Sequence, residues 1–228
     1  MREEKCIWMS AGLVLYKLCD RDYNCSICPF DQAMRGEPEE AEGVRGLLFN
    51  LEPLCFYHPC HLWVRIETPQ RVLLGIDALL SFLIRDIKAI VFPKVGDSFS
   101  RDEQFCHIIE ARGIVPLPCP ISGTVTVVNL ALKRRPELLK EDPYKAGFLV
   151  KMRPENLERD VKGLVFGREA QRWLGREEKR LLGLLGSGHE ERGVGPTMQD
   201  GGEALSVASE LPDVEFMRVI EKFVRAER

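Results

Sequence analysis

The sequence predicts a mainly β core between a cysteine-rich N-terminal module and an α-helical C-terminal extension. Three observations lead to this fold class. Short apolar segments separated by glycine and proline fill the middle of the chain, four of the eight cysteines gather near the start, and apolar residues recur at helical spacing toward the end. We expect four parts: residues 1–46, the module and a linker; 47–154, the β core; 155–185, an amphipathic helical extension; and 186–228, a glycine-rich linker and a terminal helix.

The β core is predicted from segments rich in β-branched and apolar residues. Glycine and proline mark the turns between these segments. One segment has a helical pattern instead, and Asp77 stands where it can cap that helix. We expect the helix at 77–85 and strands at 61–67, 71–76, 87–92, 105–111, 114–117 and 124–130.

The C-terminal extension has the pattern of amphipathic helices. Apolar residues such as Leu157, Trp173 and Leu181 recur at helical spacing, and charged residues occupy the other positions. Gly167 is a candidate break in this pattern. We favour packing of the extension on the β core, and docking to a partner protein is the alternative.

Composition restricts the class of protein. A net charge of −3 over 228 residues gives no reason to expect nucleic acid as a partner. No run of about 18 apolar residues suggests a membrane span, and the charged start lacks the pattern of a secretory signal. We therefore expect a cytoplasmic protein, in which cysteines serve as metal ligands, redox thiols or buried residues more often than as disulfides.

Four stretches in the middle of the chain carry a resemblance to a known family. In this order they are His61–Glu67 followed by Gly75–Ile76; Phe92–Asp97; Pro120–Val125 leading to Val128–Asn129; and Pro136–Leu139, Glu141–Tyr144 and Gly147–Leu149, ending at Pro154. Together they resemble the H protein of the glycine cleavage system, over residues 58–154 and under half of the chain. The resemblance implies a lipoyl-type β-sandwich, or flattened barrel, without catalytic activity.

The resemblance also implies a carrier position. In active H proteins, a lysine on a hairpin carries lipoamide and passes an aminomethyl group between enzymes. Counting back from the turn at Pro120–Gly123 places that lysine at Arg112. Lipoylation needs a nucleophilic amine, whereas the arginine guanidinium stays protonated. No lysine occurs between Lys94 and Lys133, so lipoate is not expected.

Arg112 itself has two interpretations. It is either an ordinary solvated turn residue or a contact to an acidic partner or ligand. The matching residues on both sides indicate that the fold is retained, which does not by itself imply a retained activity.

The N-terminal cysteines suggest a metal site. Cys19, Cys25 and Cys28 lie close together in the sequence, Cys6 precedes them, and Pro29 follows the last. Thiolates three positions apart can bind one ion from a single turn, and two further thiolates complete a tetrahedron. A proline after the last cysteine is also common around iron–sulfur clusters. We expect zinc or an iron–sulfur cluster on these four thiols.

Two other interpretations of these cysteines stay open. Cys25 and Cys28 can form a reversible redox pair, although the strand-then-helix context of such pairs is missing. Alternatively, the thiols are free and packed beneath Trp8, Tyr16 and Phe30.

The remaining cysteines and histidines favour structural roles. His58, Cys60 and His61, with Cys55 nearby, have a spacing that could bind a metal, but His61 begins a stretch of the H-protein resemblance and we favour a structural role. Cys106 and Cys119 are expected in the core. His107 is expected to be exposed.

Three functional hypotheses follow. The first is a non-lipoylated H-protein relative that acts as a binding, scaffold or regulatory protein for protein partners, with a cysteine-bound metal. The second is a working lipoyl carrier of the glycine cleavage system. The third is an electron-transfer or redox-sensing protein with an iron–sulfur cluster. No catalytic constellation is present in the sequence, so we do not expect an enzyme.

Overall fold

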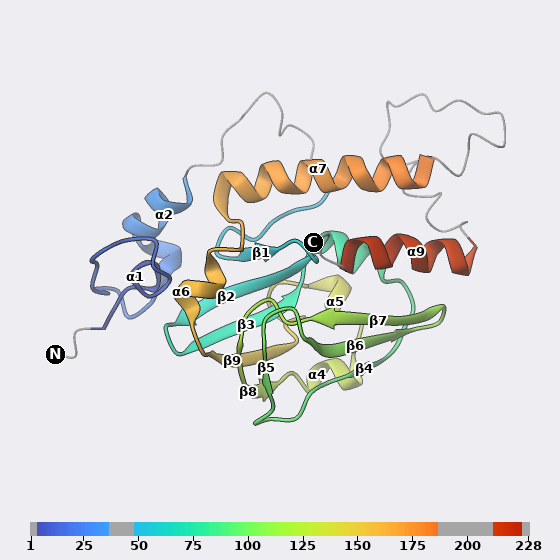
Figure 1. The fold of residues 1–228 in the computed structure, drawn as a ribbon, viewed down its shortest axis with the longest axis horizontal. Coiled ribbons are helices and arrows are strands. Elements are labelled where there is room, and N and C mark those ends of the chain that lie inside the picture. The colour runs from blue at the N-terminus through green and yellow to red at the C-terminus, as the bar shows by residue number, and fades with distance from the viewer. Residues whose placement is uncertain (1–3, 37–47, 187–211, 225–228) are drawn as a thin grey trace.

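The computed structural model describes residues 4–36, 48–186 and 212–224. Its centre consists of two antiparallel sheets (Figure 1). Residues 37–46 of the expected linker and most of the glycine-rich segment at 186–202 lie outside the described residues.

The larger sheet has six strands and the smaller one has three. In spatial order the larger sheet contains β1 (Phe56–His58), β2 (Leu62–Thr68), β3 (Arg71–Ile76), β9 (Val150–Pro154), β8 (Gly123–Val128) and β5 (Ser98–Phe99). The smaller sheet contains β4 (Ile87–Val91), β6 (Gln104–Glu110) and β7 (Gly113–Pro118). The expected β core is confirmed as two antiparallel sheets, but these sheets do not close into the flattened barrel that the expected fold class also named.

The strands form where the alternation of apolar and polar residues places the apolar side chains inward. Leu74, Ile108 and Val125 come from both sheets and are fully or almost fully buried in one core. All six expected strands form, with ends shifted by two residues at most. Three further strands, β1, β5 and β9, were not predicted from the sequence. Each has only two to five residues and therefore little periodicity of its own.

Short helices complete the β core. The helix α3 (Ala78–Leu83) begins as expected, because Asp77 Oδ1 accepts a hydrogen bond of 2.9 Å from the backbone N–H of Leu80. Two more short helices, α4 (Ala131–Arg134) and α5 (Leu138–Glu141), lie between β8 and β9 in the chain.

The described part of the C-terminal extension packs on the core, as expected. It contains α6 (Leu157–Val161), α7 (Gly167–Gly186) and α9 (Asp213–Val224). The long helix α7 runs beside β1, and α9 lies between α7 and the β6–β7 hairpin (Figure 1). Trp173 and Leu181 of α7 are buried. Gly167, the expected break, is the first residue of α7 and has a φ of +53°.

The N-terminal module sits at one end of the large sheet (Figure 1). It consists of α1 (Ile7–Ser10), a 3₁₀ turn η1 (Cys25–Ile27), α2 (Pro29–Arg35) and loops. Trp8 is fully buried, and its ring packs against Phe56 and Phe166 of the core. Its Nε1–H donates a 2.9 Å hydrogen bond to Asp31 of α2. This one side chain therefore joins both helices of the module to the core.

The Trp63–Gly75 pair gives a test of the sheet register. Gly75 lies opposite Trp63 across β2 and β3, and a Cβ at position 75 would overlap the indole ring. We expect Gly75→Ala to lower the free energy of unfolding by about 1–3 kcal/mol, because overpacking forces side chains from their preferred rotamers.

The matched control for that substitution is Gly183→Ala. Position 183 is exposed on α7, and an added Cβ meets nothing within 4 Å. This change should raise the free energy of unfolding by about 0.5–1 kcal/mol, since alanine is the better helix former. Urea denaturation of both variants measures the difference, and equal effects would argue against the close packing of Trp63 on Gly75.

Candidate functional site

The expected carrier position lies at the tip of the β6–β7 hairpin. Glu110 is paired with Gly113 across the two strands, so Ala111 and Arg112 form the two-residue turn between them. The backbone N–H of Ala111 donates a 3.0 Å hydrogen bond to the carbonyl of Asp86. The hairpin expected from the sequence is therefore present, and Arg112 occupies its tip.

Arg112 is not a solvated turn residue, which corrects one of the two interpretations above. Only 14% of its side chain is exposed. Its Nη2 donates a 3.0 Å hydrogen bond to Glu110 Oε1, and its Cζ lies 3.3 Å from the centroid of the Phe216 ring. The acidic group that it contacts belongs to its own hairpin.

Glu110 explains why a cation is needed here. Its side chain is fully buried, and Oε1 also accepts a 3.0 Å hydrogen bond from the backbone N–H of Arg85. A carboxylate without a counter-ion is costly in such a place. The Arg112 guanidinium supplies the charge and, being planar, can also lie flat on an aromatic ring.

The helix α9 covers the hairpin tip. Phe216 is fully buried above Arg112. The side chain of Met217 lies so close to Gly113 that an added Cβ would contact it at 2.8 Å. A group attached at position 112 would thus have to displace α9 before it could extend into solvent.

The same helix reaches a buried ionic cluster around His61. The His61 ring lies 5.0 Å from Trp173 of α7 and 5.1 Å from Phe223 of α9, measured between ring centroids. Its Nδ1 is 2.8 Å from Asp77 Oδ2, and its Nε2 is 3.5 Å from Glu177 Oε2. Asp77 therefore both caps α3 and pairs with His61.

These carboxylates set the charge of His61. Burial lowers the pKa of His61, but the carboxylates of Asp77 and Glu177 outweigh burial and raise it to about 9. The imidazole is thus protonated at neutral pH, and it lies between aromatic faces that attract a cation.

The neighbouring histidine behaves in the opposite way. His58 is buried, and burial lowers its pKa to about 4, although Asp102 at 3.2 Å from Nε2 opposes the shift. Its Nδ1 accepts a 3.2 Å hydrogen bond from the backbone N–H of Cys60. The side chains of His58 and His61 are thus held by local partners, in keeping with the structural role that we favoured.

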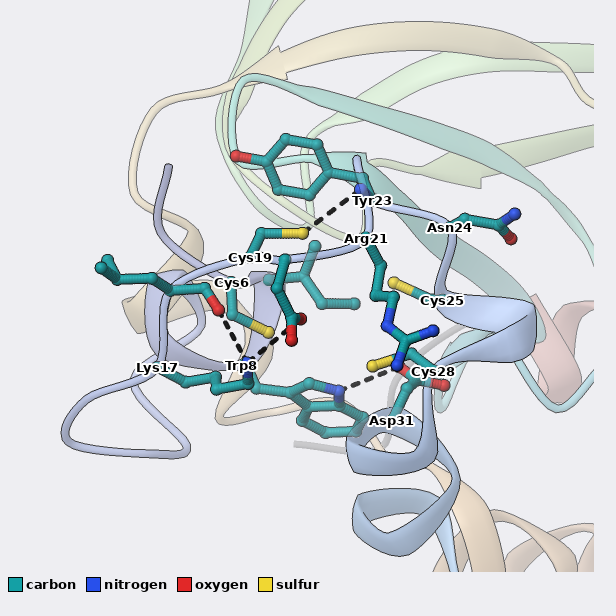
Figure 2. Close-up of a pocket in the computed structure, with 13 residues that line it drawn as sticks. Cys6, Trp8, Lys17, Cys19, Arg21, Tyr23, Asn24, Cys25, Cys28 and Asp31 are labelled. Carbon is teal, nitrogen blue, oxygen red and sulfur yellow. Dashed lines mark hydrogen bonds and ion pairs between the residues drawn. The ribbon is translucent and has the colours of Figure 1, made fainter. Parts of the chain in front are cut away.

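The four N-terminal cysteines come together around one small pocket. Cys6, Cys19, Cys25 and Cys28 all line a cavity of about 10 Å³ (Figure 2). No group of three or more His, Cys, Asp or Glu side chains within the described ranges has the arrangement of a formed metal site. The structure therefore gathers the expected ligands without showing metal binding.

The structure also tests the other expectations for the cysteines and for His107. All eight cysteines lie within the described residues, and none of them forms a disulfide. Cys106 and Cys119 are fully buried, as expected, and burial raises the pKa of each to about 12. Packing of the N-terminal thiols beneath Tyr16 was wrong, because that side chain is largely exposed. His107, which we expected to be exposed, is half-buried.

The two antiparallel sheets and the long β6–β7 hairpin define a β protein of the class that the sequence resemblance implied. Comparison with known families then gives the family. The model named "Glycine cleavage H-protein" matches residues 55–177, more than half of the chain. The chain belongs to the glycine cleavage H-protein family.

Individual relatives agree with this membership. The glycine cleavage system H protein of Chromobacterium violaceum is 38% identical over 109 residues, which cover 48% of this chain and 84% of that protein. The glycine cleavage system H protein of Psychrobacter cryohalolentis is 31% identical over 101 residues, covering 44% of this chain and 80% of that protein. A crystal structure of an H protein from Mycobacterium marinum matches with a TM-score of 0.44 and 26% identity, covering 46% of this chain and 87% of the other.

The family and the structure each bear on one broader expectation. Proteins of this family are non-catalytic carriers, which agrees with the expectation that the chain is not an enzyme. Among the residues that the structure describes, no helix is both long and apolar enough to span a membrane.

The contact between α9 and the hairpin was not predicted from the sequence. The apolar spacing of Phe216, Ile220 and Phe223 indicated a helix with a buried face. That spacing could not say which surface the face covers. The sequence Glu110-Ala111-Arg112 placed opposite charges two residues apart at the hairpin tip, but it did not indicate a covering helix.

The pairing at the hairpin tip can be tested by removing the cation. Arg112→Met keeps an unbranched side chain but leaves Glu110 buried without its counter-ion. We expect a loss of about 3 kcal/mol in the free energy of unfolding, since removal of one member of a buried ion pair is strongly destabilising. Chemical denaturation at neutral pH measures the loss.

The control for that substitution is a double-mutant cycle with Glu110→Gln, which removes the charge that needs a partner. The double variant Arg112→Met/Glu110→Gln should recover part of the lost stability. Additive losses would show that the two side chains do not interact.

The charged state of His61 predicts a pH dependence of stability. The unfolded pKa is about 6.5, and the folded pKa is raised to about 9. The contribution of His61 is therefore complete below pH 6.5 and is lost as the pH rises through 9. We expect roughly 3 kcal/mol to disappear across this window.

The control variant is His61→Asn, because asparagine tolerates the left-handed φ of 60° at this position and does not titrate. The free energy of unfolding is measured against pH for the parent protein and for this variant. The difference between the two curves isolates the contribution of His61 from that of cysteines that titrate at high pH. Parallel curves from pH 6.5 to 9.5 would rule out a protonated His61.

Proposed function

We propose that this protein is a non-carrier member of the H-protein family that acts as a binding, scaffold or regulatory protein for other proteins. The observation that carries the proposal is Arg112 at the hairpin tip, held by Glu110 and Phe216. Arginine cannot accept a lipoyl group by the amide chemistry that a lysine uses, because its guanidinium stays protonated and is a poor nucleophile.

The packing around the tip supports the same proposal. A carrier arm must move between partner sites, but here α9 lies across the tip, with Phe216 buried over the guanidinium. The sequence offers no substitute lysine between Lys94 and Lys133. The arginine also has a structural task, since it neutralises the buried Glu110. Both the chemistry and the surroundings of position 112 therefore oppose a swinging arm.

The retained fold supports a binding role. As the resemblance implies, an H protein works by presenting its hairpin face to partner enzymes. A member that keeps the two sheets but lacks the lipoyl arm can bind such a partner enzyme without transferring a group. The partner is proposed to be a protein, and nothing in the net charge of −3 favours a nucleic acid.

Two alternatives predict different outcomes. A working lipoyl carrier in the glycine cleavage system requires a lipoyl adduct on a lysine of this chain. An electron-transfer or redox-sensing protein requires an iron–sulfur cluster, and hence a coloured protein when purified without oxygen. The lipoyl adduct is the signature that the non-carrier proposal excludes, whereas the cluster separates the electron-transfer alternative from a colourless protein.

The proposal predicts that a lipoate ligase leaves the protein unmodified. The full chain is incubated with ligase, ATP and lipoate, and its intact mass is measured, with the H protein of Chromobacterium violaceum as the positive control. We expect the unmodified mass for this chain. A lipoyl adduct on it would overturn the proposal.

Two variants separate the chemistry from the covering helix. Arg112→Lys restores an amine but leaves α9 in place, so we expect little modification. Arg112→Lys with Phe216→Ala also loosens the cover, and this variant should be modified to a greater extent. Equal modification of both would show that α9 does not protect the tip.

A further inference from the structure

The loops of the N-terminal module bring two separate pairs of thiols to one pocket. Cys6 and Cys19 lie next to an isolated antiparallel bridge between Lys5 and Leu18. Backbone hydrogen bonds flank this bridge, from the Cys6 N–H to the Lys17 carbonyl at 3.0 Å and from the Cys19 N–H to the Glu4 carbonyl at 2.7 Å. This bridge forms one wall of the pocket.

The second wall carries Cys25 and Cys28. Cys25 begins the 3₁₀ turn η1 and Cys28 precedes α2, and the Cys28 N–H donates a 3.1 Å hydrogen bond to the Cys25 carbonyl. Spacing and turn together place both thiols at the pocket (Figure 2). Two thiolates from a turn and two from a second segment are the donor set of tetrahedral zinc sites.

The chain between the walls is bent in a way that costs energy. Asp22 and Tyr23 both have positive φ, 49° and 60°, although neither is glycine. Such residues cost roughly 1–2 kcal/mol each. The bend lets the Tyr23 N–H donate a 3.3 Å hydrogen bond to Cys19 Sγ, an interaction that orients a thiolate ligand (Figure 2).

The module holds this bend with its own hydrogen bonds, from the Asn24 N–H to the Arg21 carbonyl at 2.8 Å and from the Tyr23 hydroxyl to the Lys5 carbonyl at 3.2 Å. Its two helices have four and seven residues. Trp8, Asp31 and Arg35 tie the helices to the core, with Arg35 Nη1 donating a 2.7 Å hydrogen bond to the Pro53 carbonyl. The bridge and the loop that follows it lie on the other side of the pocket. Segments this short usually need a metal or disulfides for stability.

The pocket suits one ion in size and charge. Its cavity of about 10 Å³ is close to the space that a single water molecule needs. Of the charged residues that line it, Asp20 is paired with Lys17 and Asp31 with Arg35. Arg21 also lines the pocket and adds a positive charge, which offsets the net negative charge of a metal bound to four thiolates.

We propose that Cys6, Cys19, Cys25 and Cys28 form a structural site for one divalent, thiolate-binding metal ion of the zinc type. The thiols line the pocket but do not yet stand in a coordinating arrangement, so binding turns the four Sγ atoms toward its centre. Each thiol releases its proton as its bond to the metal forms. The proposal is independent of Arg112, and it stands or fails separately from the proposed function.

The test is metal analysis of the full chain purified without oxygen. We expect about one zinc per chain in the parent protein and in Ser26→Ala, a control in the same 3₁₀ turn whose hydroxyl donates a 2.7 Å hydrogen bond to Asn24 Oδ1. Cys28→Ser should lose most of the zinc and unfold at a lower temperature. A protein with no stoichiometric metal, which also fails to give the visible spectrum of tetrahedral Co²⁺ on titration, would overturn the proposal.

A second measurement needs no variant. Cys19, Cys25 and Cys28 are partly exposed, so alkylation followed by peptide mapping should label them slowly in the metal-loaded protein and rapidly after chelation. Equal labelling before and after chelation would contradict the site. Iron together with acid-labile sulfide would also contradict it, because a cluster needs more room than a single ion and would support the electron-transfer alternative.

Discussion

The contact between Arg112 and Phe216 joins two parts of the structure that are far apart in the sequence, the β6–β7 hairpin and α9. The guanidinium lies 3.3 Å from the ring centroid and neutralises Glu110, which is fully buried next to the hairpin turn. The cation therefore stabilises the hairpin turn and, through the aromatic ring, attaches α9 to it. Farther along α9, Phe223 packs on His61, so the same helix covers both the hairpin tip and the buried ionic cluster. The residue at the expected carrier position is thus the centre of a local network.

Much of the core could be predicted because it follows from local patterns. Asp77 caps α3 as its position before an apolar stripe indicated, and the turn at Pro120–Gly123 placed the hairpin tip at Arg112. What could not be predicted depends on contacts between distant segments. The apolar face of α9 was visible in the sequence, but its destination was not. Likewise, a histidine at position 61 gives no sign that Asp77 and Glu177 will face its two ring nitrogens.

In the candidate sites, too, local spacing could be predicted and contacts between distant segments could not. Cysteine spacing grouped Cys25 with Cys28, while the pairing of Cys6 with Cys19 depends on a bridge between Lys5 and Leu18 that no periodicity announces. The two sites also lie on different parts of the fold, one in the N-terminal module and the other at the hairpin (Figure 1). Membership of the H-protein family accounts for the hairpin and the sheets. The family match starts at residue 55, so the cysteine module is an addition to the family domain.

Position 112 is proposed to serve structure and to carry no lipoyl group. The intact mass of the protein, purified from the cells that naturally make it, tests this proposal with the native ligase and lipoate present. We expect the mass of the unmodified chain, apart from any metal that survives ionisation. A mass increased by one lipoyl group, mapped to a lysine of this chain, would contradict it.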